Sequence, residues 1–150
     1  MTFNQLHENT DCDCLIKSQE NTENLFARKV GKAKTELKSR DFKTHHERGI
    51  TVASPDDCSK VCGKRGLSVD IWNDDTKAAI LQRFMTTFAI SPKLKNHLSI
   101  IKFKEGAGVV KHTPVVEPIP NENHYDFYKS DEFNLDLVEL VELIPLRQNV

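Results

Sequence analysis

Apolar residues recur every three or four positions between residues 22 and 39, a spacing typical of an amphipathic helix. These positions are Phe26, Val30, Ala33 and Leu37. Thr22 is placed to cap such a helix, and Glu23 would lie beside the positive end of the helix dipole. The pattern predicts an N-terminal amphipathic helix over residues 22–39.

A second, shorter helix is predicted from its capping residues. Ser54 can cap it, and Pro55 has the backbone geometry that suits the first helical position. Asp56 and Asp57 favour the positive end of the dipole. Gly63 can supply the left-handed residue that ends the helix. We therefore expect a short helix between residues 54 and 63.

Alternation of apolar and polar residues predicts a strand with one buried face at residues 67–72. In this segment the apolar Leu67, Val69 and Ile71 alternate with Ser68, Asp70 and Trp72. Aromatic and β-branched residues predict further strands at 50–52, 84–90, 98–103 and 109–112. The sequence Gly-Ala-Gly at 106–108 predicts that the last two of these form a hairpin.

The C-terminal third of the chain is less clear. Its prolines at 114, 118 and 120 exclude a regular helix and predict a stiff, extended surface loop. The last apolar run, residues 133–144, fits both the helical and the strand period, and we favour a strand ended by Pro145. The chain is thus predicted to have an α+β fold. Residues 22–150 would form a single compact domain, with a mixed or antiparallel sheet, the N-terminal amphipathic helix and short additional helices, preceded by a polar segment at 1–21.

The composition excludes a membrane span, because no segment approaches the roughly 20 apolar residues that one needs. The first residues lack the basic region, apolar stretch and cleavage site of a secretory signal, so we expect a cytoplasmic protein. In that compartment the four cysteines would be thiols or metal ligands rather than disulfides.

The cysteine spacing favours a structural zinc site. Cys58 and Cys62 are four residues apart on the predicted short helix, so both sulfurs would project from one face. Cys12 and Cys14 would project from one side of an extended segment and complete a tetrahedral set. His45 or His46 could replace one sulfur. The alternative is that the cysteines are reduced thiols that pack in the core.

Charge is unevenly distributed along the chain. Residues 28–43 contain seven basic residues and two acidic ones, whereas residues 117–142 contain eight acidic residues and one basic one. The basic segment predicts contacts with a protein partner or an anionic polymer such as a nucleic acid, through Arg28, Lys32 and Lys38.

A group of titratable residues suits acid–base chemistry. His112 and His124 could serve as acid and base, and Asp126 would lie on the same side of an extended segment as His124 and orient its ring. The chain lacks the G-x-x-x-x-G-K-[ST], H-E-x-x-H and G-x-S-x-G motifs of nucleotide-binding proteins, metalloproteases and hydrolases.

Two functions follow as hypotheses. The first is a small intracellular binding or adaptor protein, stabilised by a structural zinc site, that acts through protein or nucleic-acid contacts. The second is a small ribonuclease-like hydrolase that uses His112 and His124. The two differ in one geometric requirement, because the hydrolase needs both histidines in one cleft.

Overall fold

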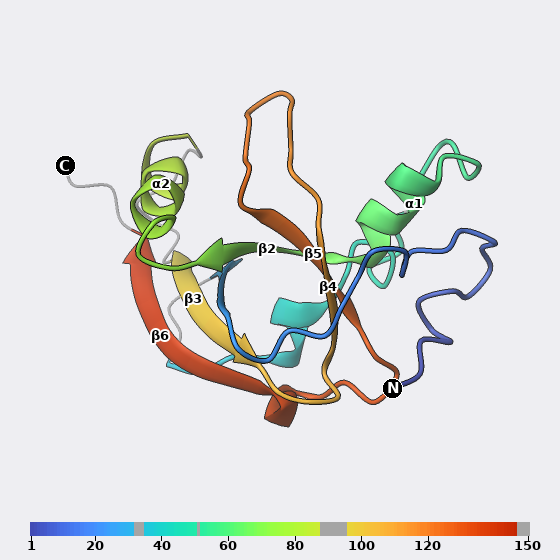
Figure 1. The fold of residues 1–150 in the computed structure, drawn as a ribbon, viewed down its shortest axis with the longest axis horizontal. Coiled ribbons are helices and arrows are strands. Elements are labelled where there is room, and N and C mark those ends of the chain that lie inside the picture. Colours follow the sequence, from blue (N-terminus) through green and yellow to red (C-terminus); the bar gives the residue numbers. More distant parts are fainter. Residues whose placement is uncertain (32–34, 51, 88–95, 147–150) are drawn as a thin grey trace.

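Six β-strands form one antiparallel sheet in the computed structural model, which describes residues 1–31, 35–50, 52–87 and 96–146. The strands lie in the order β4-β5-β2-β1-β3-β6 (Figure 1). Their bounds are β1 Leu25–Val30, β2 Leu67–Trp72, β3 Asn96–Phe103, β4 Gly108–His112, β5 His124–Lys129 and β6 Val138–Leu146. The described helices are α1 (Cys58–Arg65), α2 (Lys77–Gln82) with the π-helical turn Arg83–Thr87, and the 3-10 turns Ser39–Phe42 and Leu135–Leu137.

The predicted N-terminal amphipathic helix is wrong. Residues Leu25–Val30 form β1, a central strand that pairs with β2 and with β3. Phe26 and Val30 are four residues apart, and four is a spacing that a helical face and one face of a strand share. Ala33 lies outside the described residues, and Leu37 lies in a non-helical segment that packs against the core. The predicted α+β fold is therefore corrected to a single antiparallel sheet with two short α-helices among the described residues.

The second predicted helix is present but shifted. Helix α1 begins at Cys58, and its cap is Asp57, whose side chain accepts a hydrogen bond of 3.2 Å from the Ser59 N–H. It continues past Gly63 to Arg65. The sequence contains several residues that can begin or end a helix here, so it locates the helix without fixing its ends.

The strand predictions have mixed outcomes. Those at 67–72, 98–103 and 109–112 are confirmed by β2, β3 and β4, and the C-terminal run is a strand, although Pro145 lies within β6 instead of ending it. The predicted strand at 50–52 is wrong for Ile50 and Val52, which are not in a strand, and Thr51 lies outside the described residues. At 84–90, the residues up to 87 are helical and the rest lie outside the described part.

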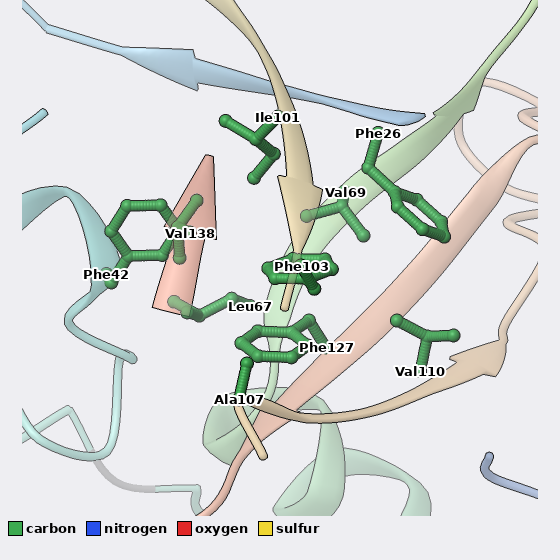
Figure 2. Close-up of a cluster of buried hydrophobic side chains, with 10 residues drawn as sticks. All are labelled: Phe26, Phe42, Leu67, Val69, Ile101, Phe103, Ala107, Val110, Phe127 and Val138. Atoms are coloured by element: carbon green, nitrogen blue, oxygen red, sulfur yellow. The ribbon is translucent and has the colours of Figure 1, made fainter. Parts of the chain in front are cut away.

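The predicted hairpin of 98–103 with 109–112 is also wrong, because β3 and β4 belong to opposite sides of the sheet. A connection of four residues, 104–107, can join them only if the sheet is strongly curled. The core confirms this curl, because it receives buried side chains from all six strands (Figure 2). The rings of Phe103 on β3 and Phe127 on β5 stack with their centroids 3.9 Å apart, although β1 and β2 separate these strands in the sheet.

The outer face of the curled sheet carries two covered apolar areas. Helix α2 and the turn after it supply Ile80 and Phe84, which pack on β1, β3 and β6. The N-terminal segment and α1 cover β4 and β5, where Tyr128 is buried. Figure 1 shows α2 and α1 at opposite ends of the sheet, with the 113–121 loop rising between them. No described helix has the length and apolar character needed to cross a membrane.

Candidate functional site

Polar side chains occupy the outer face of the sheet between its two apolar covers. On β2 and β5, Ser68 is paired with Asp126, and Asp70 is paired with His124. Residues paired across antiparallel strands lie on the same face, so these four side chains all face outward. Leu67 and its partner on β5 face the core instead. These four outward-facing polar side chains form a strip on the sheet, and neither of the two apolar areas described above covers it completely.

A cavity of about 230 Å³ opens over this strip, and we call it the outer cleft. It is lined by Ala27, Arg28, Lys29, Ser68, Asp70, Arg83, Phe84, Val115 and His124. These residues come from β1, β2, β5, the turn after α2 and the 113–121 loop. Pockets for drug-sized ligands measure roughly 300–1,000 Å³, so this cleft suits a smaller group.

His124 is held in the cleft by hydrogen bonds on both ring nitrogens. Its Nδ1 lies 2.8 Å from the main-chain oxygen of Thr113 and 2.9 Å from the Thr113 hydroxyl. Its Nε2 lies 3.0 Å from the Ser68 hydroxyl. A carbonyl oxygen can only accept, so Nδ1 carries the hydrogen, and in the neutral ring Nε2 accepts from Ser68. The fold thus places a basic nitrogen against an exposed serine hydroxyl.

The cleft has an excess of positive charge. Among the residues that line it, Lys29 and Arg83 are cationic and Asp70 is a carboxylate, whereas the guanidinium of Arg28 lies over the Phe42 ring on the core side of the sheet. The buried carboxylate of Asp70 accepts a hydrogen bond of 2.7 Å from Asn121 and lies 3.5 Å from Arg83. Lys29 is exposed and has no ion pair within the ranges that the structure describes.

Arg28 supports the cleft from the core side of the sheet, where its guanidinium lies over the Phe42 ring. Its guanidinium donates to the main-chain oxygens of Asp41 and Ser68, both at 2.8 Å. Burial lowers the pKa of Arg28 to about 10, against the opposite effect of the Asp41 charge, so the group stays protonated at neutral pH. These bonds tie β1 to the strand that carries Ser68.

Asp126 follows His124 on the outer face of β5 and is buried, with 7% of its surface exposed. Burial raises the pKa of Asp126, although His124, a hydrogen bond from Thr113 and the charge of Lys111 act in the opposite direction. Gly66 makes room for this carboxyl, because a Cβ at that position would lie 3.1 Å from the Asp126 Cβ. Asp126 is therefore linked through Thr113 to His124, which lines the outer cleft.

The raised pKa predicts a pH-dependent effect of Asp126→Asn. The folded chain holds this proton more tightly than the unfolded chain, so Asp126 costs stability increasingly as the pH rises from its ordinary pKa of 3.8 through the raised value. Asparagine cannot ionise and removes this cost. In urea unfolding, the variant should gain stability relative to the natural chain between pH 4 and pH 7. A difference in unfolding free energy that is the same at both pH values would contradict the assignment.

His112 does not share the cleft with His124. It pairs with Tyr125 on the inner side of the sheet, where the two rings lie 4.8 Å apart, and its Nε2 lies 2.7 Å from the Glu122 carbonyl. Tyr125 and His124 are consecutive strand residues, so His112 and His124 face opposite sides. Of the predicted catalytic residues, the structure brings only His124 and Asp126 together. A hydrolase mechanism that uses both histidines therefore lacks its required geometry.

The predicted basic contact surface is not a helix. Arg28 lies in β1 with its guanidinium bonded to main-chain oxygens, and Lys38 forms an ion pair with Glu36 at 2.5 Å. Lys32 lies outside the described residues. In contrast, the sequence reasoning missed the Ser68 hydroxyl and Arg83. The polar alternation of residues 67–72 signals only that Ser68 faces away from the core.

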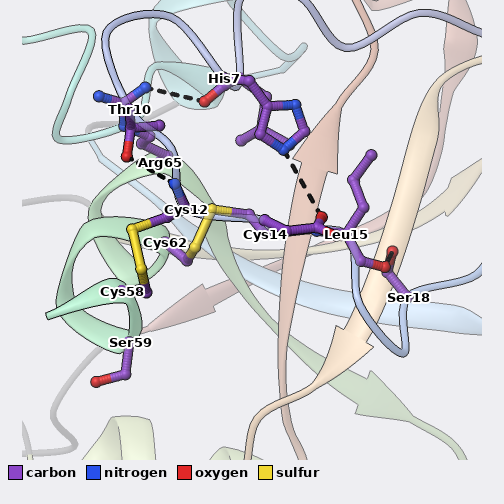
Figure 3. Close-up of a disulfide and its surroundings, with 12 residues drawn as sticks. His7, Thr10, Cys12, Cys14, Leu15, Ser18, Cys58, Ser59, Cys62 and Arg65 are labelled. Carbon is purple, nitrogen blue, oxygen red and sulfur yellow. Dashed lines mark hydrogen bonds and ion pairs between the residues drawn. A yellow bond between two sulfur atoms is a disulfide. The ribbon is translucent and has the colours of Figure 1, made fainter. Parts of the chain in front are cut away.

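The zinc prediction is wrong, because the four cysteines form two disulfides, Cys12–Cys58 and Cys14–Cys62 (Figure 3). Each pair has its Cα atoms 5.4 Å apart, within the range that a disulfide needs. Metal binding by cysteine requires a thiolate, which a disulfide does not offer. Within the described ranges no group of three or more His, Cys, Asp or Glu side chains is arranged to hold a metal ion, and this includes His45 and His46.

The same disulfides correct the predicted cytoplasmic location. Cytosolic reductants keep ordinary cysteine pairs reduced, whereas oxidising compartments such as the cell exterior preserve disulfides. Two structural disulfides therefore indicate an oxidising environment. They anchor the N-terminal segment to α1, and Arg65 adds hydrogen bonds to the carbonyl oxygens of Leu6 and Glu8.

Comparisons of the chain with protein-family models, with curated proteins and with solved structures find no match. The geometry and charge of the outer cleft are therefore what indicates a function for this chain.

Proposed function

We propose that the protein binds a small anionic ligand, or a small anionic group of a larger partner, in the outer cleft. The observation that carries this proposal is the excess of cationic over acidic residues around a small cavity. This proposal keeps the binding function expected from the sequence, but its binding site is the outer cleft and not the 28–38 segment. The proposed setting is an oxidising compartment, as the disulfides indicate.

The lining supports this choice of ligand in two ways. Lys29 is exposed and brings three N–H donors to the cleft, while Ser68 adds a hydroxyl that can rotate toward a bound oxygen. The apolar side chains of Ala27, Phe84 and Val115 line the rest of the cavity. Apolar side chains beside a charge lower the local dielectric constant and so strengthen an ion pair formed there. A carboxylate on a short apolar chain fits both features.

Succinate is a suitable probe, with the uncharged succinamide of similar shape as its control. Calorimetry should detect binding of succinate but not of succinamide, and the affinity should fall as salt is added. Lys29→Gln should weaken succinate binding by roughly 10-fold to 100-fold, because hydrogen bonds to charged groups contribute about 1.5–3 kcal/mol. Lys60→Gln is the matched control, since Lys60 lies on α1 and does not line the cleft.

Two results would contradict the proposed function. One is equal binding of succinate and succinamide, which would remove the role of charge. The other is equal affinity of the Lys29→Gln and Lys60→Gln variants, which would place binding outside the cleft.

A further inference from the structure

The arrangement of His124 goes beyond what anion binding requires. A neutral His124 presents a lone pair at Nε2, which is a base and not a donor for an anion. The hydroxyl that it contacts, Ser68, is exposed on the cleft wall. A serine within 3.0 Å of a histidine nitrogen has the separation expected of a nucleophile and its general base.

The base is fixed by a reciprocal clamp with Thr113. Thr113 donates its main-chain N–H to the carbonyl oxygen of His124 at 3.0 Å, and Nδ1 of His124 lies 2.8 Å from the carbonyl oxygen of Thr113. This clamp selects the tautomer and the direction of the ring, as the third member of a catalytic triad does. The buried carboxyl of Asp126 accepts a hydrogen bond from Thr113 and so lies one step further behind the base.

The cleft also contains positively charged side chains that can stabilise the negative charge that develops when an ester reacts. Attack on a carbonyl places negative charge on its oxygen, and this charge must be stabilised by donors in the site. Lys29 and Arg83 line the same cavity as Ser68, and Arg28 holds the Ser68 main chain in place at 2.8 Å. The positive lining that would bind an anion is thus next to the proposed nucleophile.

We propose that Ser68 and His124 hydrolyse small carboxylic esters whose acyl group carries a second carboxylate. Ser68 Oγ bonds to the ester carbonyl carbon while its proton passes to His124 Nε2. The ester C–O bond then breaks, and the departing alcohol takes that proton. A water molecule, deprotonated by His124, next attacks the acyl-serine; the bond to Ser68 Oγ breaks and Oγ takes the proton from His124. The released acid then loses the proton of its new carboxyl group to solvent and leaves as the dicarboxylate. The choice of acyl group rests on the proposed anion binding.

The test uses mono(4-nitrophenyl) succinate, with 4-nitrophenyl acetate as the uncharged comparison. Because the free carboxylate of the succinate ester also expels 4-nitrophenol intramolecularly, each rate is compared with that of Ser68→Ala: the oxidised, full-length chain should exceed this variant by a larger factor with the succinate ester, and mass spectrometry should locate a succinyl group on the peptide that contains Ser68. Ser68→Ala should abolish this adduct. His124→Ala should slow its formation by about 10²-fold to 10⁴-fold, the usual range for a general base.

Further variants separate chemistry from structure. Added imidazole should restore acylation of His124→Ala, and Ser68→Cys should still be acylated, whereas a residue needed only for folding would give neither result. Ser54→Ala and His112→Ala are matched controls that should react like the natural chain, since neither residue lines the cleft.

The contrary outcomes distinguish failure of the catalytic inference from failure of the proposed anion binding. If the natural chain is not acylated at Ser68 but binds succinate, the catalytic inference is overturned and the proposed binding stands. If it neither reacts nor binds succinate, both fail. An adduct at Ser68 that forms equally fast without His124 also overturns the inference.

Discussion

Removal of both disulfides should lower the free energy of unfolding by about 6 kcal/mol, whereas removal of either one should lower it by only about 2 kcal/mol. The two bridges span nearly the same part of the chain, with separations of 46 and 48 residues. While one remains, the long loop stays closed, and the second closes only a short loop beside it. The loss on removing both is therefore more than twice the loss on removing one.

The measurement is urea unfolding of three serine variants. One replaces Cys12 and Cys58, another replaces Cys14 and Cys62, and the third replaces all four. The natural chain treated with dithiothreitol should match the third variant. Equal stability of the third variant and either of the others would show that loop closure is not the source of the stabilisation.

Phe127→Ala should lower the free energy of unfolding by about 3–5 kcal/mol, the usual cost of removing a buried aromatic ring. Phe127 is 1% exposed, stacks on Phe103 and meets Phe133 edge-on at 5.8 Å between centroids. It joins opposite parts of the curled sheet, so neighbouring side chains cannot easily fill the space that it leaves. The check is the unfolding midpoint and its denaturant slope.

Two further variants make this test specific. Phe127→Leu keeps much of the apolar volume and should recover part of the loss. Val116→Ala removes an apolar side chain that is 75% exposed, and its effect should stay within about 0.5 kcal/mol. If Phe127→Ala were as mild as Val116→Ala, the stacked core would not be what holds the sheet in its curled form.

The sequence predicts strands best where the spacing of apolar residues fits a strand and does not fit a helix. Leu67, Val69 and Ile71 recur every second residue, which a helix cannot bury on one face, and β2 follows the predicted range. Phe26 and Val30 are four residues apart and satisfy both periods, so the helix prediction failed there. What decides the structure is pairing with β2 and β3, which lie some 40 and 70 residues further along the chain, and local spacing carries no record of such partners.

The cysteine prediction failed for a different reason. Spacing indicated that Cys12 and Cys14 belong with Cys58 and Cys62, and the structure does bring these residues together. The chemistry was then chosen from an assumed cytoplasmic location, which favours thiols and metal ligands. Spacing alone does not distinguish a metal-bound set from two parallel disulfides.

The outer cleft was only partly predictable. His124 and Asp126 stand out in the sequence, because histidine and aspartate at that spacing share one face of a strand. Ser68 becomes their neighbour only through the register of β2 against β5. The register of these two strands depends on pairing between residues more than fifty positions apart. The serine that contacts His124 could therefore not be identified from the sequence.

The central claim, that the outer cleft is the binding site for an anionic group, is tested most directly by NMR titration of the oxidised chain with succinate. We predict saturable shifts of the amide signals of Lys29, Ser68 and His124, which line the cleft, and no such shifts with succinamide. Saturable shifts confined to α1 and the N-terminal segment, or no shifts at all, would contradict the claim.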